Sequence, residues 1–196
     1  NLIAISTGKT TIAFEGLQTN RKVVLQNDDY SNIVKEDPKK IEHASARYTT
    51  NMMVKYGRES GAYQINGSDP AEKFIENRTL LDGRFINSRD LALQQKVAVI
   101  GRMVQRDLIK NGSPVGKDLD LNGTMFKVIG VFADDGGDQD ERMISVPLST
   151  LQQLKKGSDT ISRVYITYDP NLTPEAAIAY SDQLEKNLKK DLKVSP

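Results

Sequence analysis

The stretch Gly8-Lys9-Thr10 has the residue types that close a phosphate-binding loop, in which backbone N–H groups and a lysine hold nucleotide phosphates. That motif also needs an earlier glycine, where this chain has Ile3, and a strand leading into the loop. Only seven residues precede Gly8, which leaves little room for a strand. We therefore interpret the stretch as a polar loop that enters a strand, and we predict no cofactor site.

An acidic loop, Asp134–Glu141, holds five carboxylates in eight residues. Carboxylate oxygens at this density could bind calcium. The loop does not follow the EF-hand spacing, in which acids at alternate positions precede a glycine and a later glutamate. We interpret it as a solvated loop tip, and calcium binding stays an open alternative.

His43 is the only histidine, and the chain has no cysteine. A catalytic triad or a zinc site would therefore depend on His43 alone. His43 follows Glu42 in a segment with strand character, where neighbouring side chains point to opposite faces. No Gly-x-Ser-x-Gly turn supplies a nucleophile, and no spacing selects a pair of catalytic carboxylates. We predict no catalytic residue and no metal site.

Four lysines, Lys186, Lys189, Lys190 and Lys193, gather near the C-terminal end of the chain. On a helix they would complement the negative end of the helix dipole. Anionic lipid headgroups are an alternative partner for such a cluster.

The composition bounds the class of protein. The 196 residues are 38% apolar and 27% charged, with a mean hydropathy of −0.49, which is typical of a globular chain with a hydrophobic core. Basic and acidic residues nearly balance at a net charge of +1, which gives no case for nucleic acid as a partner. No apolar run approaches the roughly 20 residues of a membrane span. The missing cysteines exclude a disulfide scaffold.

Periodicity and turn residues predict an α+β fold, with short helices among strands and hairpins. Predicted helices begin near Asp28, Asp69, Arg102, Ser149 and Thr173. The last of these helices places Ala177, Tyr180, Leu184 and Leu188 on one face. Predicted strands cover 11–14, 22–26, 41–56 as one or two strands, 62–66, 96–100, 143–146 and 160–168, with a turn at 81–85 and a hairpin over 119–132.

Four motifs follow one another in the middle of the chain: Leu81-Asp82-Gly83-Arg84-Phe85 with Asp90, Lys96-Val97-Ala98-Val99-Ile100-Gly101, a Pro114-to-Val131 hairpin, and Val146-Pro147. In this order they resemble the extracytoplasmic domain of MacB-like and FtsX-like ABC transporter permeases. The resemblance is strong over about residues 80–150 and weak over 20–66.

The residues that carry the resemblance are Gly83, Arg84, Phe85, Gly101, Pro114, Gly116, Lys117, Asn122, Gly123, Phe126, Gly130 and Pro147. They are residues for turns and for burial, so we expect them to define the fold and not an active site.

The resemblance implies a porter-like α/β part and an inserted, mostly β part. We map the insert to 67–158 and the porter-like part to 1–66 and 159–196. The first residue, Asn1, is not a methionine, and we expect the chain to be a piece excised from between two membrane helices. Both ends would then meet a bilayer, so we expect them within roughly 20 Å of each other.

The resemblance further implies a non-catalytic, periplasmic domain of a bacterial inner-membrane permease, which transmits cytoplasmic ATP-driven motion to substrate export or transfer. Its partners would be the permease's own transmembrane helices and a cytoplasmic ABC ATPase. A second permease copy, a periplasmic adaptor or lipoprotein, or an outer-membrane channel are further partners of such proteins. The alternative is a free secreted or periplasmic binding or adhesion module.

Overall fold

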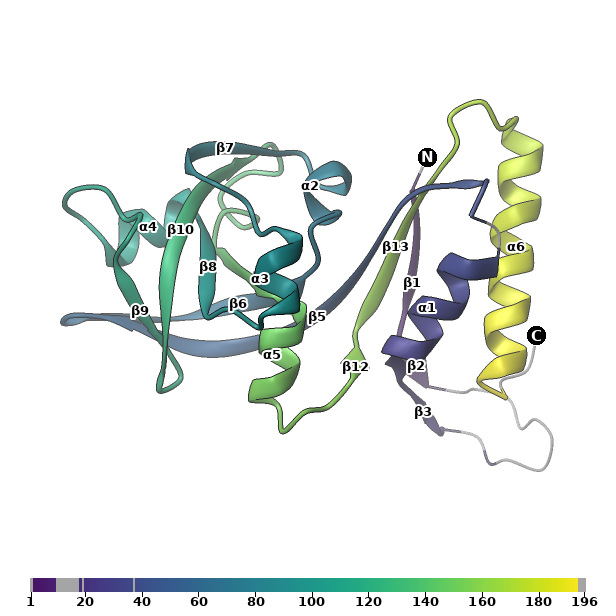
Figure 1. The fold of residues 1–196 in the computed structure, drawn as a ribbon, viewed down its shortest axis with the longest axis horizontal. Helices are drawn as coiled ribbons and strands as arrows, with labels where there is room; N and C mark the ends of the chain where they lie inside the picture. Colours follow the sequence, from purple (N-terminus) through teal and green to yellow (C-terminus); the bar gives the residue numbers. More distant parts are fainter. Residues whose placement is uncertain (1, 10–17, 19, 37, 194–196) are drawn as a thin grey trace. The chain divides into compact units, whose positions relative to one another are not determined.

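A computed structural model describes residues 2–9, 18, 20–36 and 38–193 (Figure 1). The chain divides into two compact units, Asn1–Ala46 with Asp159–Pro196, and Arg47–Ser158. The mixed α/β content confirms the predicted fold class. The predicted strand at 11–14 lies outside the described residues.

The first unit is built on three neighbouring strands: β1 (Leu2–Ser6), β13 (Arg163–Tyr168) and the first six residues of β5 (Ile41–Tyr56). β1 runs antiparallel to β13, with Leu2 opposite Thr167. The sequence analysis did not expect a strand in this first segment. β1 gains its hydrogen bonds from a strand about 160 positions away, so no local pairing signal marks it.

Two further short strand pairs lie among the described residues of this unit. β2 (Gly8–Lys9) pairs with β3 (Lys22–Val23), and β4 (Leu25–Gln26) pairs with β12 (Thr160–Ile161), both antiparallel. Gly8 and Lys9 therefore lie in a strand ladder and not at the start of a helix.

Helices α1 (Asn27–Glu36) and α6 (Pro174–Asp191) contact each other in the first unit (Figure 1). α6 begins where predicted: Thr173 accepts a hydrogen bond from the Ala176 N–H at 3.2 Å, and Pro174 takes the first helical position. Its buried face is the predicted one, made of Ala177, Tyr180, Leu184 and Leu188. This apolar stripe is what holds α6 to the unit.

Six strands of the second unit pair into a closed ring. They are the remainder of β5, β6 (Glu59–Ser68), β11 (Met143–Pro147), β8 (Val97–Gly101), β10 (Thr124–Asp134) and β9 (Asp118–Leu121). β5 pairs with β6, β6 with β11, β11 with β8, β8 with β10, β10 with β9, and β9 with β5. Such closure leaves few strand edges open.

β7 (Arg78–Gly83) extends the sheet by pairing with the second half of β10. The sequence analysis read 81–85 as a turn, but the strand continues through Gly83 before the chain turns. Four short helices connect the strands: α2 (Glu72–Ile75), α3 (Ser88–Ala92), α4 (Arg102–Leu108) and α5 (Leu148–Leu154). Ser149 does not cap α5 as predicted, because its hydroxyl donates to the Leu91 carbonyl oxygen at 2.5 Å.

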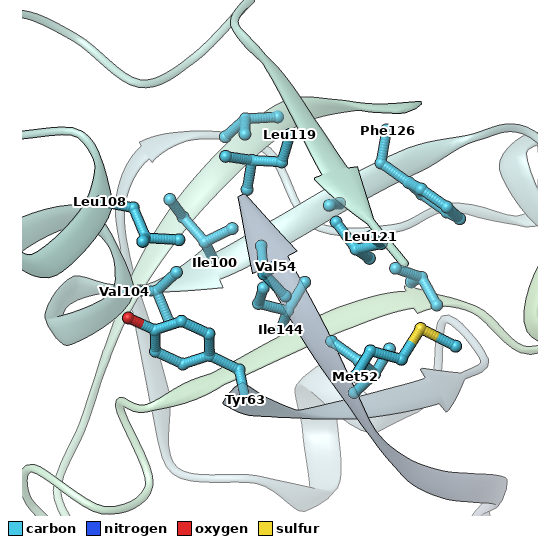
Figure 2. Close-up of a cluster of buried hydrophobic side chains, with 14 of the residues drawn as sticks. Met52, Val54, Tyr63, Ile100, Val104, Leu108, Leu119, Leu121, Phe126 and Ile144 are labelled. Atoms are coloured by element: carbon cyan, nitrogen blue, oxygen red, sulfur yellow. The ribbon is translucent and has the colours of Figure 1, made fainter. Parts of the chain in front are cut away.

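The ring encloses the main hydrophobic core, in which side chains from the strands and α4 converge (Figure 2). Val54, Ile100, Phe126 and Ile144 are completely buried there. The predicted hairpin is confirmed, and Asn122 and Gly123 hold its turn with φ of 50° and 94°.

Because β6 pairs with both β5 and β11, residues 47–66 pack within the second unit. The sequence analysis had placed these residues with the first unit.

Candidate functional site

Two glycines of the family motifs lie where β7 and β10 meet. Gly83 lies opposite Gly130 in the antiparallel ladder, and the Arg84 N–H donates to the Ile129 carbonyl oxygen at 2.9 Å. A Cβ on Gly83 would collide with the Ile129 carbonyl, and one on Gly130 with the Arg84 carbonyl. Gly83 also has a φ of 73°, so both the lack of space and the backbone conformation favour glycine at this position.

Arg84 and Asp90 form a two-bond ion pair at one end of α3. Arg84 Nη1 and Nη2 lie 2.6 and 3.0 Å from the two carboxylate oxygens of Asp90. Asp90 also completes a capping box with Asn87. The Arg84 hydrogen bonds lower the pKa of Asp90, against the opposing effect of burial. This pair fixes the loop that carries Phe85, whose ring is half-buried.

Gly101 ends β8 against the backbone of Glu141, which leaves no room for a Cβ. The Glu141 carboxylate is 1% exposed and accepts two hydrogen bonds from the Arg102 guanidinium, both at 3.0 Å. It also accepts the Asp134 N–H at 3.1 Å. Both ends of the acidic loop are thus tied into the fold.

The remaining motif residues surround the hairpin and the end of β11. The Gly116 N–H donates to the Val128 carbonyl oxygen at 2.8 Å, close to Pro114, and Lys117 Nζ donates to the Asn111 carbonyl oxygen at 2.8 Å. Phe126 is in the core, and Pro147 is the last residue of β11. The motif residues are thus distributed around the second unit, and they do not converge on one pocket.

A cluster of buried charges lies in the second unit and was not predicted from the sequence. Arg78, whose side chain is 4% exposed, lies 3.4 Å from Glu72 and 3.3 Å from Asp134. Arg47 pairs with the other oxygen of Glu72 at 2.6 Å and with Glu76. No local signal marked this cluster, because Arg47 and Arg78 pair with carboxylates that are distant in sequence.

A small hollow of about 20 Å³ adjoins this cluster, lined by Glu72, Arg78, Ser145 and the rings of Phe85 and Phe132. This volume matches roughly one water molecule and is too small for an organic substrate. Arg47 and Arg78 are paired with the neighbouring carboxylates, so the cluster can hold strands β5 and β7 to α2 and β10.

A larger groove lies in the first unit. Its volume is about 400 Å³, and its walls are aliphatic side chains of β1, of 23–25 and of the C-terminal half of α6, including Ile5, Leu25 and Leu188. Glu185 and Lys189, paired at 2.6 Å, lie at its rim. The cluster of lysines predicted from the sequence therefore has at least one member engaged with a neighbouring carboxylate.

The other residues considered for catalysis or metal binding have structural surroundings. The backbone N–H of His43 donates to Thr167 Oγ1 at 3.0 Å within the first unit. In the part of the chain that the structure describes, no three His, Cys, Asp or Glu side chains are grouped to hold a metal ion. No described helix combines the length and apolar character of a membrane span.

This arrangement, with a strand ring inserted into an α/β unit, is also the fold of the external domains of two solved transporters. The periplasmic region of MacB from Actinobacillus actinomycetemcomitans superposes with a TM-score of 0.81 at 20% identity, covering 98% of this chain and 86% of that one. The extracellular domain of the Gram-positive transporter YknZ gives 0.79 at 16% identity, covering 98% and 96%.

The chain belongs to the MacB-like periplasmic core domain family, whose model matches residues 1–184. The predicted family, and with it the extracytoplasmic location, is thereby confirmed. Relatives include the macrolide export ATP-binding/permease protein MacB of Bdellovibrio bacteriovorus, 28% identical over 85% of this chain. The pyoverdine export ATP-binding/permease protein PvdT of Pseudomonas putida is 32% identical over 56%. The chain spans 26% and 17% of these two relatives.

Proposed function

We propose that this domain transmits ATP-driven motion from the cytoplasmic side of an ABC permease to the export or transfer of a substrate outside. The observation that carries the proposal is the insertion of the second unit between two segments of the first. The first and last described residues, Leu2 and Lys193, both belong to the first unit. Force applied through the first unit would then reach the ring through the two connections near residues 46 and 158.

We propose further that the domain is not itself catalytic. Its buried carboxylates are engaged with arginines, and Gly8-Lys9 lies in a strand ladder instead of a phosphate-binding turn. The relatives are named ATP-binding/permease proteins, and this chain matches only a minor share of each. The ATPase would therefore be a separate domain or subunit.

The proposed partners of the domain are the transmembrane helices of the same permease and a cytoplasmic ABC ATPase. A second permease copy, a periplasmic adaptor or lipoprotein, or an outer-membrane channel would receive the motion. In this proposal both ends of the domain meet the bilayer, so we expect them to lie within roughly 20 Å of each other.

The test uses the full-length permease, reconstituted with its ATPase in vesicles. Residues 47–158 are replaced by a short flexible linker, and ATP hydrolysis and substrate export are measured on the same preparation. We expect hydrolysis to continue and export to stop. Export at the parent rate would overturn the proposal. Loss of both activities in protein that is correctly inserted would assign the second unit to the ATPase cycle itself.

A further inference from the structure

Several ion pairs of the second unit are joined, through one backbone hydrogen bond, into a connected chain. Arg102 binds Glu141, whose Oε1 accepts the Asp134 N–H. The Asp134 carboxylate binds Arg78 Nε at 3.3 Å, and Arg78 Nη1 lies 3.4 Å from Glu72 Oε2. The chain then continues from Glu72 Oε1 through Arg47 to Glu76.

Its middle members are withdrawn from water. The side chains of Arg78, Glu72 and Asp134 are 4%, 9% and 10% exposed. Buried charges interact strongly with their partners and are costly to leave alone. A displacement of one member is therefore opposed unless its neighbours follow.

Each link joins a different element of the fold. Arg102 begins α4, Glu141 and Asp134 are the two ends of the acidic loop, Arg78 begins β7, and Glu72 begins α2. Arg47 is the first residue of the second unit. Arg78 is further held by the Phe132 ring, 4.5 Å from its guanidinium carbon, and by Ser145 Oγ at 3.1 Å. These contacts limit independent movement of the central arginine.

We propose that this chain is a coupling device, which ties the conformation of the loop Asp134–Glu141 to that of α2 and Arg47. A force on the loop, whose Asp135 and Asp138 are exposed, would change the stability of α2. A force on α2 would likewise change the stability of the loop. Glu72 is the necessary link because its two oxygens bind two different arginines. The inference concerns the fold of the second unit and does not depend on the transport role.

Amide hydrogen exchange on the chain 1–196 tests the coupling from both ends. Glu72→Gln cuts the chain in the middle, and the loop amides of Asp140 and Glu141, which donate to the Gly137 carbonyl, report at one end. Arg102→Lys weakens the exposed end, and the α2-region amides of Phe74 and Glu76 report at the other. We expect exchange at the remote end to accelerate about tenfold in each variant.

Glu59→Gln is the matched control, because it removes an ion pair with Lys110 in which both side chains are about half exposed. We expect no remote acceleration in this variant. Acceleration confined to the substituted end, or equal to that of the control, would overturn the proposal. If Glu72→Gln does not fold, the Arg102→Lys variant alone tests the proposal. The Arg102 side chain is 57% exposed, so we expect its replacement to leave the hydrophobic core in place.

Discussion

Gly83 and Gly130 face each other across the β7–β10 ladder, and each leaves room for a carbonyl oxygen of the other strand. The close approach lets β7 pair with the same edge of β10 that β9 occupies earlier along the strand. Two residues from separate family motifs thus make one structural feature.

We expect Gly130→Ala to lower the free energy of unfolding by about 1–3 kcal/mol, because the added methyl group must displace the Arg84 carbonyl. Gly83→Ala should cost at least as much, since its φ of 73° adds backbone strain. Denaturant unfolding of the chain 1–196 measures both. Gly8→Ala, with no atom within 4 Å of the new Cβ, is the control and should change little. Equal stability of all three variants would contradict the account.

We expect Asp90→Asn to destabilise the protein by about 1–3 kcal/mol at neutral pH, since it weakens the two-bond pair with Arg84 and the capping box. Asp118→Asn removes an exposed pair with Lys127 and should cost less than about 1 kcal/mol. Chemical denaturation at one pH compares them. An equal loss in both variants would remove the special role of the Asp90 pair.

The same pair predicts a pH dependence. The folded pKa of Asp90 lies below its unfolded value of 3.8, so the pair contributes fully above that value. The contribution is lost as the pH falls through the lower, folded pKa. As the pH falls from 3.8 through the lower, folded pKa, Asp90→Asn should therefore lose less stability than the parent chain. Parallel acid curves for the two proteins would contradict this.

Tyr63 should titrate unusually high. Burial, followed by the charge and hydrogen bond of Asp107, raises the pKa of Tyr63 to about 12. Because an unfolded tyrosine loses its proton near 10, stability should fall as the pH rises from 10 to about 12. The tyrosinate absorbance of the parent minus that of Tyr63→Phe reports this group. Asp107→Asn should move its titration toward 10, and a parent titration near 10 would contradict the assignment.

Two neighbouring residues of β10 allow a core side chain to be compared with a surface side chain. Phe126 is completely buried in the ring, whereas its neighbour Met125 is 52% exposed. Phe126→Ala should cost about 3–5 kcal/mol because it leaves a cavity. Met125→Ala should stay within about 0.5 kcal/mol. Thermal or denaturant unfolding distinguishes them, and similar costs would mean that Phe126 is not in the core.

Local signals predicted much of this fold. Asn122-Gly123 predicted the hairpin turn, and Thr173-Pro174 predicted the start of α6. The apolar run 96–100 predicted the strand that the structure places at Val97–Gly101. Each of these features depends on residues within a few positions of one another, which is the range over which turn, cap and periodicity rules operate.

Features built from distant residues could not be predicted in this way. The boundary of the second unit depends on the parallel pairing of β6 with β11, and the charge cluster joins Arg47 to Asp134 through Glu72 and Arg78. Such pairings are set by tertiary structure, and no spacing rule identifies them.

ATP-driven motion of this domain can be measured directly with attached dyes, because these 196 residues contain no native cysteine. Gln153→Cys in the second unit and Glu175→Cys in the first, both exposed, are each labelled with a donor dye in the full-length permease. Residual cysteines elsewhere are removed. Energy transfer to acceptor lipids in the bilayer is then recorded with ATP and with ADP. We expect energy transfer from both labels to change with ATP and not with ADP. Identical transfer with both nucleotides, in vesicles that still export, would contradict it.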